Sequence, residues 1–251
     1  KHGADELRAL VGSKNSGFCV LEAVGDEDWL VIHDEGQRIP VMEVSSIPVT
    51  FDGAAAFNTS NAMHAILAAH LMGIRIGDCR KAMREFHASF EMTPGRLNFF
   101  DNLPFRVIMD YAHNPVGLRK LCDFIDHQAA DGRKVIAFAG SSDRTDEQIR
   151  NMARSVAGHF DFYFCKEYTP DGKRRDRPTS HILQQELLEC GISRERTAST
   201  TYGRDVIFEI LDSCQPGDLL VMAMGNVEKF QLAGFIDDYI EARPDLCEND
   251  S

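Results

Sequence analysis

Arg106-Val-Ile-Met-Asp-Tyr-Ala-His-Asn-Pro-Val-Gly-Leu118 is the stretch of this sequence that decides the fold. The apolar residues 107–109 predict a short buried strand. Asn114 is a favourable helix N-cap, and Pro115 suits the first helical position because its missing N–H is not needed there. Apolar residues then recur at helical spacing, at Leu118, Leu121, Cys122 and Ile125. The stretch therefore predicts a strand that turns directly into an amphipathic helix.

Two polar residues, Asp110 and His113, lie where this strand ends and the helix begins. In open α/β sheets ligands bind outside the carboxyl ends of the strands, and a helix N-terminus attracts anions. We therefore predict that Asp110 and His113 face a ligand that carries phosphate. The alternative interpretation is that both are ordinary polar residues that close a strand.

Beyond this turn, strands and helices alternate regularly. Strands 96–100 and 104–111 are expected to pair, followed by strands 134–139, 161–166, 198–202 and 218–223 and by helices 115–129, 145–158, 179–190, 204–213 and 227–241. Thr145 and Gln148 have the spacing of a capping box. The alternation predicts an α/β fold with a parallel sheet covered by helices.

The upstream part has a different pattern. Strands are expected at 17–24, 28–34, 37–44 and 47–51, with a hairpin at Glu35-Gly36 and a turn at Asp52-Gly53. A helix is expected from Asn58 to a stop at Gly73, and a second one over 78–88. Residues 1–16 suggest a loop or short helix. The breaker cluster at 93–95 predicts a domain boundary, so we expect one domain over 1–94 and another over 95–251.

Composition limits the classes of function. The formal net charge of −12 at pH 7 opposes non-specific binding to nucleic acid or to an anionic membrane. Seven scattered cysteines without a C-x-x-C pair predict no zinc site and fit a reducing, cytoplasmic environment. The longest apolar stretch, residues 65–74, is too short to span a bilayer, and no signal peptide is recognisable. Because the chain begins at Lys1, we expect a piece of a longer protein.

Four short segments resemble the Mur ligase superfamily, to which the folylpolyglutamate and cyanophycin synthetases also belong. Residues 110–115 (Asp-Tyr-Ala-His-Asn-Pro) resemble the signature of its C-terminal domain, and residues 57–63 (Phe-Asn-Thr-Ser-Asn-Ala-Met) resemble a helix start in its central domain. Residues 94–96 (Pro-Gly-Arg) resemble the linker. Residues 142–147 resemble a Gly-Asp-Arg-Arg-Asp-Glu segment, although Ser141-Ser142 replaces the usual Pro-Gly.

The order and spacing of these segments match the family, so the resemblance covers nearly the whole chain. The upstream hairpin with Ile-Pro-Val at 39–41 and Ile-Pro-Val-Thr at 47–50 is most similar to the cyanophycin synthetases. The resemblance implies a Rossmann-like Mur ligase C-terminal domain, residues 95–251. It also implies that residues 1–94 are the C-terminal portion of the ATP-binding central domain.

The resemblance implies an ATP-dependent amide ligase. In this family ATP phosphorylates a carboxylate, and an amino group then attacks the acyl phosphate. In cyanophycin synthetases the reaction adds arginine to poly-aspartate. The expected partners are therefore ATP, an amino acid, and an acidic peptide or poly-aspartate acceptor.

Site residues follow from the same resemblance. Asn58 and Asn61 would face the adenine, because an amide can donate and accept at once. Arg96 would reach the ribose or the phosphates as a fixed cation. Each asparagine has an alternative role in its helix, Asn58 as the N-cap and Asn61 as a first-turn residue.

The remaining implied residues follow the predicted strands. Asp110 and His113 would be catalytic: Asp110 would bind the ribose or organise the nucleotide, and His113 with Asn114 would meet the γ-phosphate or acyl phosphate. Asp143 and Arg144 would contact the substrate, or they would only cap and flank a helix. Such catalysis rests mainly on positioning and on charge stabilisation.

Parts of a Mur ligase are missing from the sequence. It has no G-x-x-G-K-T phosphate loop, since Gly-Lys occurs only at 172–173 and no Ser or Thr follows. We therefore expect the ligands of Mg²⁺ to lie upstream, outside this chain, and expect this polypeptide alone to be inactive.

Three alternatives stay open. The chain could belong to another ligase of the family, such as a folylpolyglutamate synthetase or a peptidoglycan-precursor ligase. It could also be a non-catalytic module that binds a nucleotide or a partner. The basic residues 173–177 could hold an acidic acceptor or form a solvated loop. The sequence leaves the oligomeric state open, a homo-oligomer included.

Overall fold

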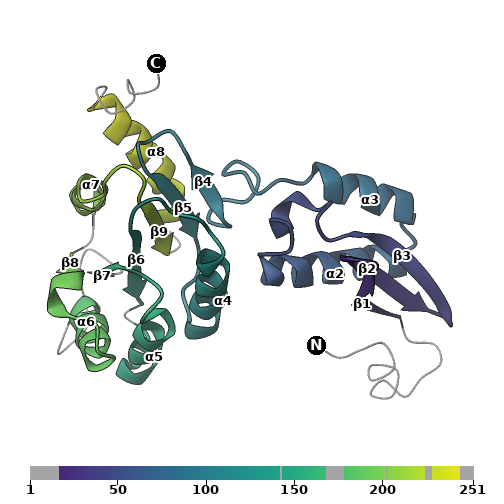
Figure 1. The fold of residues 1–251 in the computed structure, drawn as a ribbon, viewed down its shortest axis with the longest axis horizontal. Coiled ribbons are helices and arrows are strands. Elements are labelled where there is room, and N and C mark those ends of the chain that lie inside the picture. The colour runs from purple at the N-terminus through teal and green to yellow at the C-terminus, as the bar shows by residue number, and fades with distance from the viewer. Residues whose placement is uncertain (1–16, 142, 168–177, 202, 224–227, 244–251) are drawn as a thin grey trace. The chain divides into compact units, whose positions relative to one another are not determined.

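The computed structural model describes residues 17–141, 143–167, 178–201, 203–223 and 228–243. Contacts divide the chain into unit 1, Lys1–Ala88, and unit 2, Ser89–Ser251 (Figure 1). The predicted opening segment 1–16, Ser142 and the basic residues 173–177 lie outside the described residues. Within the described residues, none of the helices has the length and apolar character needed to span a membrane.

Unit 1 is a three-stranded antiparallel sheet with helices packed against it. The strands are β1 (Phe18–Val24), β2 (Glu27–Asp34) and β3 (Gln37–Glu43), in the order β1-β2-β3, and the helices are α2 (Ala56–Leu71) and α3 (Ile76–Glu85). Glu35 (φ 47°) and Gly36 (φ 78°) form the predicted two-residue hairpin, whose turn type requires positive φ at both positions. The core joins Leu30, Ile32 and Val41 of the sheet to Ala62 and Ile66 of α2.

The predicted strand at 47–51 is wrong. This segment forms a short 3-10 helix, η1 (Pro48–Thr50). The Thr50 hydroxyl donates to the carbonyls of Ile47 (2.7 Å) and Val44 (2.8 Å), which curls the segment back on itself. Phe51 and Asp52 follow with φ of 51° and 54°, so the chain turns here and cannot extend into a strand.

The two helices of unit 1 also differ from their predicted bounds. α2 begins at Ala56, and its N-cap position is Ala55, so the alternative that Asn58 caps this helix is wrong. Gly73, with φ of 82°, ends the helix as predicted, and its N–H donates to the carbonyl of His70. α3 ends at Glu85, three residues before the predicted end, because Phe86 already has extended backbone angles.

Unit 2 contains the predicted sheet. Its strands are β4 (Asn98–Phe100), β5 (Arg106–Asp110), β6 (Lys134–Gly140), β7 (Phe162–Glu167), β8 (Thr197–Thr200) and β9 (Leu219–Ala223). Their order is β4-β5-β9-β6-β7-β8, and all neighbours are parallel except the β4–β5 pair. The predicted α/β class with a parallel sheet is confirmed.

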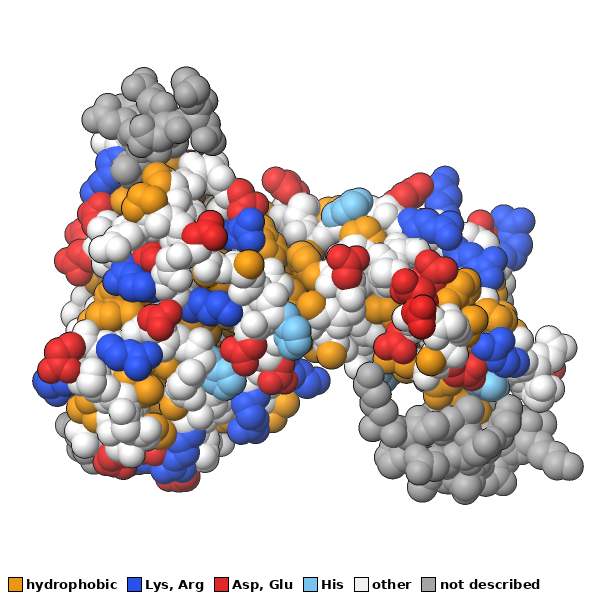
Figure 2. Space-filling view, in the orientation of Figure 1, with side chains coloured by type: hydrophobic (Ala, Val, Ile, Leu, Met, Phe, Trp, Pro, Cys, Tyr) orange, Lys and Arg blue, Asp and Glu red, His pale blue; other side chains and the backbone are white. Residues whose placement is uncertain are grey.

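Helices cover both faces of this sheet (Figure 1). One face carries α4 (Pro115–Asp126), α5 (Asp146–Val156) and α6 (Thr179–Glu189), and the other carries α7 (Arg204–Asp212) and α8 (Glu228–Glu241). Strand residues Val107, Met109, Ala137 and Met222 pack against α7 and α8 in one continuous core. On the surface shown in Figure 2, acidic and basic side chains of the described residues are interspersed.

Two of the predicted helix caps in unit 2 are confirmed in detail. The Asn114 side chain accepts a hydrogen bond from the Gly117 N–H at 2.8 Å, and Pro115 occupies the first helical position of α4. Thr145 and Gln148 form the predicted capping box at α5. Local polar side chains therefore set where both helices begin.

Replacing Asn114 with alanine is expected to lower the free energy of unfolding of unit 2 by about 1 kcal/mol, because the Gly117 N–H loses its acceptor. Asn114→Asp keeps the acceptor and is expected to stay within about 0.5 kcal/mol of wild type. The transition of unit 2 can be followed by tyrosine absorbance, since all five tyrosines lie in this unit and the single tryptophan lies in unit 1. Val116→Ala, in the same turn but exposed, is the matched control. An equal loss in Asn114→Asp would contradict the capping role.

Candidate functional site

The carboxyl edge of the sheet carries five of the predicted residues on two neighbouring connections. Asp110 ends β5, which is in register with Ala223 of β9, and β9 in turn is in register with Phe138 of β6. The loops after β5 and β6 therefore leave the same edge of the sheet, on either side of β9. They carry His113 with Asn114 and Asp143 with Arg144. Neighbouring strands lie about 4.8 Å apart, so the two loops begin roughly 10 Å from each other.

Asp110 is the buried member of this edge, with 8% of its surface exposed. Its Oδ2 accepts a hydrogen bond from the Leu97 N–H at 3.1 Å. The neighbouring Tyr111 N–H donates to the Gly95 carbonyl at 2.8 Å. The end of β5 is thus tied to the segment that carries Arg96.

Burial raises the pKa of Asp110 to about 6. The Leu97 N–H, the Arg96 charge and the Ala112 N–H act in the opposite direction but do not outweigh burial. A carboxylate kept charged in such a place near neutral pH costs folding free energy. Perturbed groups of this kind gather at functional sites.

Tyr111, which follows Asp110, contacts two further side chains, those of Arg96 and His113. The Arg96 guanidinium lies over the Tyr111 ring, 5.4 Å from its centroid, and the His113 ring lies on the same tyrosine with 4.5 Å between centroids. The His113 Nδ1 is 2.9 Å from the Tyr111 carbonyl oxygen. If Nδ1 carries the proton, the ring donates to this carbonyl and Nε2 is left as the acceptor. Tyr111 thus has a cation on its ring and is in contact with the imidazole that directly precedes the N-cap of α4.

The second loop has its own internal contacts. The Ser141 hydroxyl donates to the Asp143 carboxylate, and this bond keeps the pKa of Asp143 below its usual range. The Arg144 N–H donates to the Ser141 carbonyl at 3.2 Å. Asp143 is exposed and Arg144 is half-buried. Asp143 and Arg144 directly precede Thr145, the N-cap of α5.

Asn58 and Asn61 belong to unit 1 and are described within it. The Asn58 amide donates to the Val49 carbonyl at 2.7 Å, and the Asn61 amide lies 3.4 Å from the Asn58 side-chain oxygen. Asn58 therefore fastens η1 to the first turn of α2. Asn61 is exposed.

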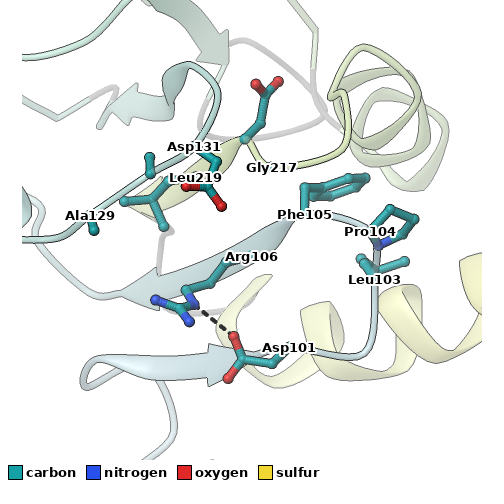
Figure 3. A pocket seen from close by; sticks show the side chains of 11 residues that line it. Asp101, Leu103, Pro104, Phe105, Arg106, Ala129, Asp131, Gly217 and Leu219 are labelled. Atoms are coloured by element: carbon teal, nitrogen blue, oxygen red, sulfur yellow. Dashed lines mark hydrogen bonds and ion pairs between the residues drawn. The ribbon is translucent and has the colours of Figure 1, made fainter. Parts of the chain in front are cut away.

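A cavity of about 570 Å³ lies at the opposite, amino edge of the same sheet. Figure 3 shows Leu103, Pro104 and Phe105 along its wall, with the Arg106 side chain turned toward Asp101 in an exposed ion pair of 2.8 Å. Since α/β sheets bind ligands at the carboxyl ends of their strands, this cavity is not the candidate site. Among the described residues, no group of three or more His, Cys, Asp or Glu side chains could hold a metal ion.

Sequence reasoning missed two residues of this region. Tyr111 joins Arg96 to His113, and its place inside the motif was the available signal. Asn98 is 1% exposed and bonds to the backbone of the segment before Arg96. Nothing in the sequence distinguishes Asn98 from any other strand residue.

The family profile and the most similar curated proteins indicate the same family for this chain. The profile of the family described as "Mur ligase, glutamate ligase domain" matches residues 95–226. A cyanophycin synthetase of Geminocystis herdmanii is 35% identical over 159 residues, which are 63% of this chain and 18% of that protein. One of Trichormus variabilis is 33% identical over 229 residues, covering 88% of this chain and 25% of that protein. This chain thus spans about a fifth to a quarter of the length of these relatives.

Solved structures share the fold. Escherichia coli FolC in complex with ADP superposes with a TM-score of 0.58 at 18% identity, covering 89% of this chain and 46% of that one. A murein peptide ligase of Psychrobacter arcticus superposes with a TM-score of 0.57 at 17% identity, covering 92% and 44%. At these identities the similarity establishes the arrangement of helices and strands.

Proposed function

The chain belongs to the Mur ligase family, and on that premise we propose that it is the C-terminal portion of an ATP-dependent carboxylate–amine ligase that acts through an acyl phosphate. Residues 95–251 would form the C-terminal domain, and residues 1–94 the end of the ATP-binding central domain. The relatives named cyanophycin synthetase support this assignment. In the proposal the chemistry occurs at the carboxyl edge of the unit 2 sheet, and the family match over residues 95–226 supports this.

One observation carries the proposal. Asp110 is a buried carboxylate with a pKa raised to about 6, at the carboxyl end of β5 and beside an exposed Arg96. Stability alone would favour a neutral residue there, since burying a charge costs free energy. The position is better explained by binding a ligand than by folding.

The residues of this edge suit an anionic ligand. Arg96 supplies a cation held against Tyr111, and the N-terminus of α4 adds the partial positive charge of the helix dipole. In the proposal His113 and Asn114 meet the terminal phosphate or the acyl phosphate, while Asp110 organises the nucleotide. Asn58 and Asn61 would face the adenine, and Asp143 and Arg144 the substrate.

The described residues do not form a binding site for Mg²⁺. Mg²⁺ is held by carboxylates together with phosphate oxygens, and the described part of the chain offers no cluster of three ligands. We therefore assign no step to a metal held by these residues. In the proposal the Mg²⁺ ligands belong to the upstream part of the ligase.

The substrate is the most specific part of the proposal. Relatives at 29–35% identity carry the name cyanophycin synthetase. We therefore propose arginine and a poly-aspartate acceptor as the preferred substrates. A diaminopimelate-adding ligase of Caldanaerobacter subterraneus, 29% identical over 71% of this chain and 35% of that protein, keeps other amino acids as the alternative. A non-catalytic nucleotide- or partner-binding module is the second candidate, favoured by the missing G-x-x-G-K-T loop.

Calorimetric titration of this polypeptide with ATP is expected to show weak or undetectable binding, because the phosphate loop is absent from its sequence. A dissociation constant in the low micromolar range, about −8 kcal/mol, would contradict this part of the proposal. If the titration shows a heat of ATP binding, Asp110→Ala and His113→Ala are each expected to abolish it. Asp101→Ala, at the opposite edge of the sheet, is the matched control and is expected to leave it unchanged.

A ligase that contains this chain is expected to consume ATP only when poly-aspartate and arginine are both present. His113→Ala should lower that rate by roughly 10²-fold or more, as loss of a group that stabilises transition-state charge does. ATP consumption with folate or muramoyl peptides but not with poly-aspartate would refute the substrate assignment. If no acceptor supports ATP consumption, the result would favour the non-catalytic module.

A further inference from the structure

Both neighbours of Arg96 in the segment Thr93–Asn98 have left-handed backbone conformations, and for Leu97 this conformation is unusual. Gly95 has φ of 75° and Leu97 has φ of 49°. Glycine adopts the left-handed region freely, but leucine does so at a cost in free energy, because its Cβ approaches the backbone. Leu97 is also fully buried, so its side chain is anchored in the interior while that of Arg96 is exposed.

Strained residues persist where the surrounding structure over-determines them. Here the restraint comes from the buried amide of Asn98. Its Oδ1 accepts from the Gly95 N–H at 2.6 Å, and its Nδ2 donates to the Thr93 carbonyl at 3.1 Å. Asn98 is 1% exposed and uses both ends of its amide on this one turn.

Further bonds hold the other side of the turn. The Arg96 N–H donates to the Thr93 carbonyl at 3.1 Å, and the Gly95 carbonyl accepts from the Tyr111 N–H. The Leu97 N–H donates to Asp110. Asn98 and Asp110, from antiparallel neighbours β4 and β5, therefore hold the turn between them. Arg96 is the residue whose side chain this arrangement presents, over the ring of Tyr111.

We propose that Asn98 is a positioning residue for the nucleotide: its amide locks the Thr93–Leu97 turn so that Arg96 is held over Tyr111 at the carboxyl edge of the sheet. This inference rests on the proposed function for the role of Arg96. The physical advantage is pre-organisation, since a long arginine side chain on a fixed turn loses less conformational entropy when it binds a phosphate. Asn98 itself would not touch the nucleotide.

The first test needs no nucleotide. In nuclear magnetic resonance spectra of this polypeptide, the Arg96 side-chain resonances should be displaced by the ring current of Tyr111, and Tyr111→Leu should remove that displacement. Asn98→Ala is expected to remove it as well, and to speed hydrogen exchange of the Gly95 amide by about tenfold. Amides of the β5–β9 ladder should keep their protection. Arg96 resonances unchanged in Asn98→Ala would overturn the proposal.

Asn98→Asp is the second variant, in case the alanine variant does not fold. It has nearly the same shape and keeps the acceptor for the Gly95 N–H, but it loses the donor to the Thr93 carbonyl. It is expected to displace Arg96 in the same direction. Asp101→Ala, an exposed carboxylate after β4, is the control and should leave the Arg96 resonances in place.

The second test separates positioning from a merely structural role. In a ligase that contains this chain, Arg96→Ala should raise the KM for ATP about tenfold. Asn98→Ala should raise it about fivefold with kcat within about twofold, and should add nothing in the Arg96→Ala background. Additive effects would overturn the inference. If Arg96→Ala leaves KM unchanged, the proposed nucleotide role of Arg96 fails, while the resonance test still decides whether Asn98 positions it.

Discussion

Replacing Asp218 with alanine is expected to lower the free energy of unfolding of unit 2 by roughly 3 kcal/mol. Asp218 is 2% exposed and precedes β9. Its carboxylate accepts from the Arg133 backbone N–H (2.7 Å), from the Arg133 guanidinium (2.6 Å) and from the Gln215 N–H (2.9 Å). One side chain thus joins the loop before β6 to the turn before β9, and its removal leaves three part-buried hydrogen bonds without their acceptor.

The stability that Asp218 contributes should decrease as the pH falls. Burial acts to raise the pKa of Asp218, but the Arg133 guanidinium and the backbone N–H groups outweigh it, and the pKa lies below the ordinary 3.8. A depressed pKa gives stability that is present above about pH 4 and is lost as the pH falls through the folded-state value. The difference between wild type and Asp218→Ala should therefore shrink in acid.

Tyrosine absorbance during urea unfolding measures this difference. Asp101→Ala is the matched control, since it breaks the carboxylate–arginine pair with Arg106 that lines the same cavity (Figure 3). Both partners of that pair are exposed, so its loss is expected to cost less than about 1 kcal/mol. Equal losses in the two variants would show that Asp218 has no special anchoring role.

Replacing Asp110 with asparagine is expected to stabilise unit 2 above pH 6 while it lowers the turnover of a ligase that contains this chain. The folded-state pKa of Asp110, about 6, lies above the ordinary 3.8. With a raised acid pKa, the native state binds more protons than the unfolded state between these values. Wild-type stability should thus fall as the pH rises from about 4 to about 6, by roughly 3 kcal/mol for a shift of about two pKa units.

Asparagine cannot ionise, so Asp110→Asn should lack this fall and keep an acceptor for the Leu97 N–H. Asp110→Ala loses that acceptor and is expected to be less stable than wild type at pH 4. In a ligase that contains this chain, Asp110→Asn should lower ATP-dependent turnover by roughly 10²-fold. The same fall in stability between pH 4 and 7 in wild type and in Asp110→Asn would refute the assignment, as would full activity of this variant.

Much of the fold could be predicted because its signals are local. Apolar runs and helical spacing identified the strands and helices of unit 2, and the caps at Asn114 and Thr145 set two helix starts. The 3-10 helix at Pro48–Thr50 escaped prediction because it depends on a hydroxyl that folds back on two carbonyls. Such a bond competes with an extended strand and leaves no periodic signal.

The candidate site was predictable only in part. The motif at 110–115 indicated the residues after β5, and the family it belongs to is shown by the profile match. No local sequence pattern indicated that Asn98, sixteen residues before Asn114, would bond to the turn that carries Arg96. The roles of Asn58, Asn61, Asp143 and Arg144 stay predictions.

The sequence by itself determined the α/β class, the family and the strand-to-helix turn, because hydrophobic periodicity, helix caps and a short motif are written in neighbouring residues. Only the tertiary structure decided the burial of Asp110, the left-handed conformation of Leu97 and the hydrogen bonds of Asn98 to Gly95 and Thr93. These depend on the pairing of β4 with β5. Desolvation and strain arise when distant segments pack, and so they have no counterpart in a single stretch of chain.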